Sequence, residues 1–167
     1  MPARSWHRAL ALAATLAGTV PAAARIAPPA AAQEAGPEFI CGTWRVQGVV
    51  TTSPLASSPD DVAPFFGAEV RYGADGMRFG TTVEIARPVY RETTVSDQDF
   101  EDAFLVSFAA LRIKGSSTHV FQVSDPADRR LLEPRIGTTV VVRNNDQILV
   151  PWAGQFMDLL RTRPCGG

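Results

Sequence analysis

The chain has 167 residues, enough for one domain with a hydrophobic core, and its 46% hydrophobic content is ordinary for a globular protein. Its 16 Lys and Arg residues nearly balance its 17 Asp and Glu residues, for a formal net charge of −1. Nucleic-acid binding requires clustered basic side chains, so this balance argues against a nucleic-acid partner.

The first 32 residues have the order of a secretory signal peptide. Basic residues come first, an apolar run covers residues 9–20, and small residues predominate from 21 to 32. The apolar run is too short for a membrane anchor, which needs about 20 residues. Two A-x-A cleavage sites compete, one after Ala24 and one after Ala32, and we favour cleavage after Ala32.

Cleavage there would leave one exported domain, residues 33–167. Three of the 16 basic side chains and none of the acidic ones lie in the removed segment, so the domain would carry a net charge of about −4. We expect no stable membrane span after cleavage. Lys114 is the only lysine, a bias of GC-rich bacterial genomes, and we therefore expect a bacterial protein of the periplasm or the secreted fraction.

Cys41 and Cys165 are the only cysteines, one near each end of the predicted domain. Export gives access to an oxidising compartment, so we expect one disulfide between them. Two free thiols or an intermolecular bond are the alternatives. The loop that this disulfide would close is long, and the chain-entropy model gives at most about 4–5 kcal/mol of stabilisation.

The first half of the domain reads as short strands and turns. In the first strand Trp44, Val46 and Val50 lie on one face, with polar residues on the other. Gly73-Ala74-Asp75-Gly76 supplies a hairpin turn. The predicted strands cover residues 44–51, 69–72, 77–79 and 81–85, with 87–90 at a sheet edge or a strand end because of Pro88.

A short helix is predicted at residues 58–66. Ser58 is a suitable N-cap, because a proline and two aspartates that suit the first turn follow it. Gly67 would end this helix. Phe65 and Phe66 would then plug one end of the core.

The main helix is predicted at about 96–114. Ser96-Asp97-Gln98-Asp99 resembles a capping box with aspartate in place of glutamate. Apolar residues then recur at spacings of three and four, and Gly115 is a natural stop. The amphipathic stripe consists of Phe100, Ala103, Phe104, Phe108 and Leu111.

The second half is again rich in strands. The longest irregular segment, residues 125–137, is charged and is either a recognition loop or a solvated connection. Asn144-Asn145-Asp146 is a good hairpin turn. The predicted strands cover residues 118–124, 138–143 and 147–152, and residues 155–161 form a last strand or a turn of helix.

These elements predict a mainly β protein with one mid-chain helix, in the α+β class. Seven to eight short antiparallel strands would form a small barrel, or a strongly curved sheet packed on the helix. A barrel places its first and last strands side by side, which is also what a bond between Cys41 and Cys165 requires.

Gly42-Thr43-Trp44 resembles the Gly-x-Trp at the first strand of lipocalins and related calycin-like small β-barrels. In that family the tryptophan closes the barrel floor and an arginine near the C-terminus packs across it; the resemblance assigns this part to Arg161 or Arg163, by cation–π contact. The resemblance implies that a small apolar ligand binds inside the barrel. The Thr-Asp-Tyr motif of lipocalins is missing, and the helix lies mid-chain instead of after the barrel. Apart from this resemblance, the simpler interpretation of Trp44 is a core aromatic without a role in ligand contact.

His119 is the only histidine in residues 33–167 and shares a strand face with Phe121 and Val123. It is a candidate pocket group or general base, or else a hydrogen-bonded or edge histidine. We take Trp44, His119 and Phe121 as candidate ligand-binding residues. The sequence has no G-x-S-x-G element and too few His and Cys residues for a zinc site, so we predict no catalytic residue, metal or cofactor.

The acidic run from Asp97 to Asp102 does not fit a calcium loop. The EF-hand pattern requires glycine at its sixth position and an acid at its twelfth, and Asp102 and Phe108 occupy these places. The run is better explained as the N-terminus of a helix with its acids facing water.

The sequence therefore predicts a small exported binding module, with a small apolar ligand or an envelope protein as its partner. The first alternative is a structural or assembly factor of the cell envelope. A hydrolase that uses carboxylates or His119 is the third hypothesis. An apolar cavity would favour ligand binding, and a filled core with an exposed aromatic patch would favour a protein partner.

Overall fold

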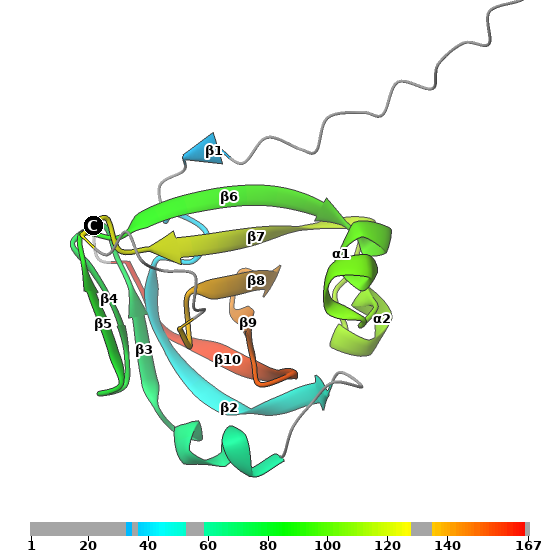
Figure 1. Ribbon diagram of the computed structural model, residues 1–167, viewed down its shortest axis with the longest axis horizontal. Helices are drawn as coiled ribbons and strands as arrows, with labels where there is room; N and C mark the ends of the chain where they lie inside the picture. The colour runs from blue at the N-terminus through cyan, green and yellow to red at the C-terminus, as the bar shows by residue number, and fades with distance from the viewer. Residues whose placement is uncertain (1–32, 35–36, 53–58, 128–134, 166–167) are drawn as a thin grey trace, which may run out of the picture.

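The computed structural model describes residues 33–34, 37–52, 59–127 and 135–165 (Figure 1). The predicted signal peptide, the Ser58 cap and the middle of the predicted 125–137 loop lie outside these residues. Within them, no helix is long and apolar enough to cross a membrane.

A single antiparallel sheet of ten strands curls into a half-barrel, which confirms the mainly β class (Figure 1). The count exceeds the predicted seven to eight because a two-residue strand precedes Cys41 and because the predicted run 87–90 is one end of an eight-residue strand. The strands are β1 (Gln33–Glu34), β2 (Gly42–Thr52), β3 (Glu69–Tyr72), β4 (Gly76–Phe79), β5 (Val83–Ala86), β6 (Val89–Ser96), β7 (Ser117–Ser124), β8 (Thr139–Asn144), β9 (Gln147–Trp152) and β10 (Gln155–Pro164).

The strand order is β1-β6-β7-β8-β9-β10-β2-β3-β4-β5. From β2 to β10 the chain runs up and down, except that β5 and β6 do not pair with each other. Between them Arg87 has a positive φ of 50° and Pro88 has no N–H to donate, so the sheet opens at this point. Of the two predicted alternatives, a small closed barrel and a strongly curved sheet, the structure is therefore the curved sheet.

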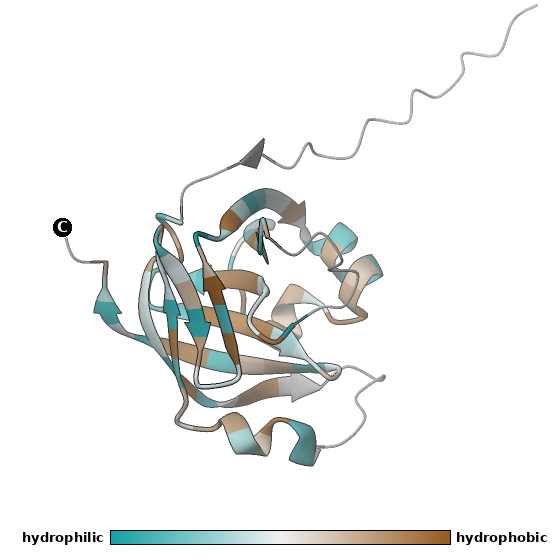
Figure 2. Ribbon diagram, turned by 60° about the vertical axis from the view of Figure 1, so that its left-hand side comes forward, coloured by the Kyte–Doolittle hydropathy of each residue, from teal (hydrophilic) through white to brown (hydrophobic). Residues whose placement is uncertain are grey.

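The larger core cluster lines the inside of the curl. Its fully buried side chains come from every part of the sheet, and Figure 2 shows hydrophobic and polar residues alternating along the strands. The largest are Ile40, Trp44, Tyr72, Met77, Phe79, Ile85, Phe121 and Ile148. Because these side chains fill the inside of the curl, the half-barrel is a packed core.

A second core cluster covers the other face of β7 to β10. Neighbouring residues in these strands point into different clusters, as Phe121 and Val120 do in β7 and Met157 and Phe156 do in β10. The two short helices α1 (Asp97–Phe104) and α2 (Phe108–Leu111), with Val106 and Ile113 beside them, supply the rest of the cluster. Strands β7 to β10 are therefore buried on both faces, which explains their nearly continuous apolar runs.

The prediction of a single helix at 96–114 is wrong, because the segment forms the two short helices α1 and α2. Ser96 caps α1 as predicted, because its side chain accepts a hydrogen bond from the Asp99 N–H at 3.2 Å. The helix ends at Leu105, which adopts the left-handed conformation with φ 57°. Ser107 then caps α2, and the Asp97 carboxylate accepts the Phe108 N–H at 2.7 Å. These side chains provide local hydrogen bonds that compete with a continuous helix.

The predicted helix at 58–66 consists of two 3-10 turns, η1 (Pro59–Asp61) and η2 (Ala63–Phe65). Phe65 packs edge-on against Phe79 at 5.7 Å between ring centroids. Phe66 is 50% exposed, so the expectation that it also plugs the core is wrong. Only one face of so short a segment can reach the sheet.

Strand β2 departs from simple alternation. Its pairing with β10 skips Gln47 and Val50, so each of these residues forms a β-bulge. Trp44 and Val46 face the inner core as predicted, but Val50 packs against the second cluster. Each bulge reverses the faces of the residues that follow and bends the strand, which favours the curl of the sheet.

Two tyrosine hydroxyl groups join segments across the inside of the half-barrel. Tyr72 donates a hydrogen bond to the Gly137 carbonyl at 2.9 Å, and Tyr90 donates to the Gly73 carbonyl at 2.8 Å. Gly137 has φ 83°, and a Cβ there would lie 2.6 Å from the Met77 methyl group. Burial raises the pKa of Tyr90 to about 12, and burial followed by the charge of Tyr90 raises the pKa of Tyr72 further.

We predict that stability falls between about pH 10 and pH 12, because the unfolded chain ionises its tyrosines near pH 10 and the folded protein does not. The stabilisation that comes from the raised pKa of the two tyrosines is fully present below pH 10 and is lost as the pH rises toward their pKa in the folded protein. Tyr72 and Tyr90 are the only tyrosines, so tyrosinate absorbance of the folded protein reports on them alone. Urea unfolding at each pH measures the stability; tyrosinate appearing near pH 10 in folded protein would contradict the prediction.

Candidate functional site

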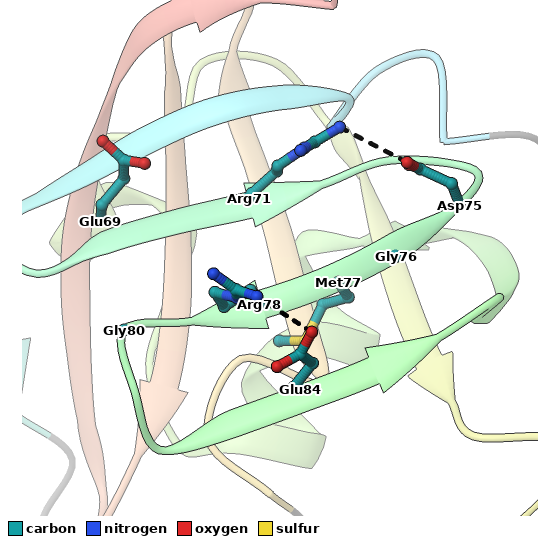
Figure 3. Close-up of a pocket in the computed structure, with 8 residues that line it drawn as sticks. All are labelled: Glu69, Arg71, Asp75, Gly76, Met77, Arg78, Gly80 and Glu84. Atoms are coloured by element: carbon teal, nitrogen blue, oxygen red, sulfur yellow. Dashed lines mark hydrogen bonds and ion pairs between the residues drawn. The ribbon is translucent and has the colours of Figure 1, made fainter.

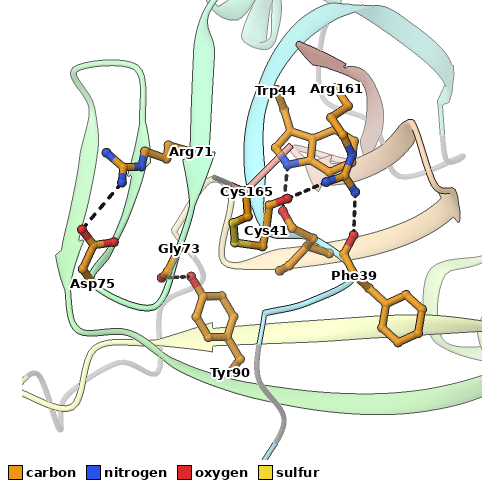
Figure 4. Close-up of a disulfide and its surroundings, with 10 residues drawn as sticks. Phe39, Cys41, Trp44, Arg71, Gly73, Asp75, Tyr90, Arg161 and Cys165 are labelled. Atoms are coloured by element: carbon orange, nitrogen blue, oxygen red, sulfur yellow. Dashed lines mark hydrogen bonds and ion pairs between the residues drawn. A yellow bond between two sulfur atoms is a disulfide. The ribbon is translucent and has the colours of Figure 1, made fainter. Parts of the chain in front are cut away.

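The disulfide between Cys41 and Cys165 joins the start of β2 to the end of β10, as predicted (Figure 4). The two Cα atoms lie 5.4 Å apart. Gly42 follows with φ 134°, and a Cβ at this position would lie 2.5 Å from the Arg163 carbonyl oxygen. Glycine is therefore required here, because no side chain fits between the two strands.

Arg161 lies over the Trp44 ring, with its guanidinium carbon 4.1 Å from the ring centroid. This is the cation–π contact that the resemblance assigned to Arg161 or Arg163. The same guanidinium donates hydrogen bonds to three backbone carbonyls, of Cys41 at 2.5 Å, Phe39 at 2.8 Å and Asn145 at 2.8 Å. Burial lowers the pKa of Arg161, and the nearby Asp146 opposes this shift. We call Cys41, Gly42, Trp44, Arg161 and Cys165 the closure cluster.

Trp44 is completely buried and its indole N–H donates to the Ile40 carbonyl at 2.8 Å. Its surroundings are those of a core aromatic, and it lines none of the four main pockets of the described residues. Ligand contact by Trp44 stays a prediction. This hydrogen bond explains why tryptophan fits here, since its buried N–H has a partner four residues earlier in the chain.

His119 and Phe121 lie on the same face of β7, as alternation predicts. Phe121 is fully buried, whereas the His119 side chain is 38% exposed and its Nδ1 lies 2.5 Å from a carboxylate oxygen of Glu92. The Phe39 ring stacks on the imidazole at 4.8 Å and lies 6.4 Å from Phe121. Phe39 thus connects both residues to the closure cluster, through its carbonyl bond with Arg161.

This arrangement resembles a hydrogen-bonded edge histidine more than a catalytic one. Glu92 orients the ring, but a general base also needs an adjacent substrate cleft. None of the pockets described contains His119. Within the described residues, no group of three or more His, Cys, Asp and Glu side chains could hold a metal ion.

The outer face of β3, β4 and β5 carries a charged depression (Figure 3). Arg71 and Asp75 lie 3.6 Å apart, and Arg78 and Glu84 lie 3.0 Å apart. All four side chains are mostly exposed, so each charge is compensated by a neighbour and by water. This face has the character of a solvated sheet surface.

An apolar groove of about 670 Å³ lies between α1, η1 and the β9–β10 hairpin. Sequence patterns missed it, because its walls come from four separate parts of the chain. Ala103, assigned to the buried stripe of the helix, is exposed and lines it. The lining residues are Asp61, Ala103, Phe104, Thr139, Pro151, Trp152, Ala153, Gly154, Gln155 and Phe156.

The aromatic walls of the groove are packed against one another. Phe104 stacks on Phe100 at 4.5 Å and meets the ring of Phe156 at 5.8 Å. Ala153 and Gly154 form the tight turn between β9 and β10, both with positive φ. Trp152, next to this turn, is only partly buried. A tryptophan directly before the turn residues Ala153 and Gly154 is the sequence signal that could have pointed to the groove.

Comparison with known proteins gives no match: no family model fits the sequence, and neither the curated proteins nor the solved structures include a significant match. The functional argument therefore depends on the chain's own geometry.

We predict that reduction lowers the thermal midpoint by at least about 4 °C, because it releases a loop of 124 residues in the unfolded chain. Calorimetry with and without dithiothreitol measures the shift. A thiol titration of the denatured, unreduced protein should detect no free thiol. The double variant Cys41→Ser, Cys165→Ser is the control, since its midpoint should not respond to dithiothreitol. An unchanged midpoint in the parent protein would contradict the prediction.

We predict that Arg161→Lys destabilises the domain by about 1–3 kcal/mol, because lysine cannot donate to three carbonyls while it covers the indole. Urea unfolding measures the loss. Arg163→Lys is the matched control, since Arg163 is an exposed arginine two residues away in the same strand. Equal effects of the two substitutions would show that the guanidinium geometry of Arg161 does not matter.

Proposed function

We propose that this protein is a small exported binding module that holds an apolar ligand in the groove between α1 and the β9–β10 hairpin. The observation that carries the proposal is the groove itself, an apolar concavity of about 670 Å³ with aromatic walls. Its volume is within the usual range of small-molecule sites. Export is supported by the signal-peptide pattern and by the disulfide, which is typical of oxidising compartments.

The ligand position differs from the one that the lipocalin resemblance implies. In the described part of the chain, the inside of the curl is occupied by fully buried aromatic and aliphatic side chains, including Trp44 and Phe121. Membership of the lipocalin family stays a prediction. The outer groove is the better candidate, because its apolar lining remains open to solvent.

Preorganisation supports small-molecule binding. The Phe100, Phe104 and Phe156 rings pack against one another, and Gln155 is 1% exposed although it also lines the groove. A site whose side chains are already packed loses little conformational entropy when it binds a ligand. The groove thus combines apolar area with a buried amide in its wall.

Docking of an envelope protein is the second candidate. Its support is a set of large hydrophobic side chains left exposed at several places on the surface: Phe39, Phe66, Leu105 and Leu160. Such side chains are common singly on soluble proteins, whereas protein interfaces need a contiguous patch. The groove is therefore the stronger feature. A hydrolase has less support, because His119, the only histidine among the described residues, has one carboxylate neighbour and lines none of the four main pockets.

We predict that a neutral apolar fluorescent probe, N-phenyl-1-naphthylamine, binds the exported domain and that Ala103→Trp blocks it, because the indole would fill the groove. Trp152→Ala should weaken binding by about tenfold through loss of apolar contact. Probe fluorescence titrations measure both effects.

Ala109→Trp is the matched control, since Ala109 is an exposed alanine on α2 that does not line the groove. This variant should bind the probe as the parent does. Undiminished binding by Ala103→Trp would place the probe elsewhere, and no binding by the parent would refute the proposed function.

A further inference from the structure

We propose that the ligand of this groove is a cationic amphiphile, a small molecule with an apolar body and an ammonium or guanidinium group. The inference rests on the proposed function and adds the chemical class of the ligand. It comes from the charges at the rim of the groove.

Asp61 is the only charged side chain in the lining of the groove. It is exposed at the end of η1, and no described residue forms an ion pair or hydrogen bond with its carboxylate. A carboxylate beside an apolar wall gives the site one end that favours water and positive charge. This is the complement of an amphiphile with a cationic head.

The helix on the other side of the groove is also acidic. Among its eight residues α1 carries four acids and no base: Asp97, Asp99, Glu101 and Asp102. Ala103 and Phe104 of the same helix line the groove, and Asp99 lies one helical turn before Ala103, on the same side. The acids of α1 therefore add to the negative charge of Asp61 on this side of the molecule, although Asp97 and Asp99 also form hydrogen bonds within the helix caps.

No described basic residue offsets this potential from within the groove, since its lining contains no Arg, Lys or His. On the neighbouring strands, Arg143 is paired with Asp158 at 3.1 Å and is nearly buried. The expected net charge of about −4 for residues 33–167 acts in the same direction. A fatty acid or another anionic amphiphile would meet repulsion at this rim.

Trp152 gives a cationic head a second favourable partner. Its ring is partly exposed and lies in the lining, where an ammonium group can approach its face. An apolar chain of the same ligand can then contact Phe104 and Phe156. The groove thus offers separate places for both ends of one cationic amphiphile.

The test compares three ligands with the same alkyl chain: dodecyltrimethylammonium, dodecyl maltoside and dodecyl sulfate, each below its critical micelle concentration. Displacement of N-phenyl-1-naphthylamine from the exported domain measures each affinity. We expect the cation to bind about tenfold more tightly than the neutral ligand at low ionic strength, and the anion to bind most weakly. Added salt should reduce the preference for the cation.

Asp61→Asn should lower the ratio of cationic to neutral affinity by about two- to fivefold. Glu84→Gln is the matched control, because it removes the same charge from the outer face of β5 and should leave that ratio unchanged. Equal affinities of the parent for the cation and the neutral ligand would overturn the cationic proposal. So would an Asp61→Asn variant with the same ratio of cationic to neutral affinity as the parent. Either result would leave the proposed function, binding of an apolar ligand in the groove, unaffected. Failure of the neutral probe to bind would instead refute the proposed function.

Discussion

The joining of β2 to β10 is the constraint on which the rest of the structure depends. Arg161 covers Trp44 and ties three backbone carbonyls together, and the disulfide between Cys41 and Cys165 secures the same two strands covalently. The two strands that the cysteines flank, β2 and β10, therefore lie at the centre of the sheet. The opening of the half-barrel falls mid-chain, between β5 and β6, where Pro88 interrupts pairing.

This placement decides where a binding site can form. The inside of the curl is filled, and the other face of β7 to β10 must be covered because its side chains are also apolar. Helices α1 and α2 provide the cover, but they are short. Where α1 meets the β9–β10 hairpin, apolar side chains remain open to solvent. The groove is thus a consequence of incomplete helical cover over a sheet that is hydrophobic on both faces.

The closure cluster and the groove have different roles. Every polar group described in the closure cluster has a partner within the protein, which is the pattern of a structural feature. The groove has an apolar wall and an acidic rim whose Asp61 has no described partner. Stability depends on the first, and the proposed ligand binding would use the second, so substitutions in one should leave the other largely intact.

Local patterns in the sequence determined most of the strands, the turns at 73–76 and 144–146, the Ser96 cap and the pairing of the only two cysteines. These features depend on residues a few positions apart, or, for the disulfide, on two cysteines that have no other cysteine to pair with. Tertiary structure alone decided the break at Leu105, the reversal of Val50 by β-bulges and the groove itself. The break is reinforced by the Asp97 carboxylate, which accepts a hydrogen bond from the Phe108 N–H eleven residues later. The β-bulges form only because β2 pairs with β10. The groove forms only where η1, α1, β8 and the β9–β10 hairpin come together. Such long-range contacts leave no periodic signal in the sequence, because their members are chosen by packing and not by spacing.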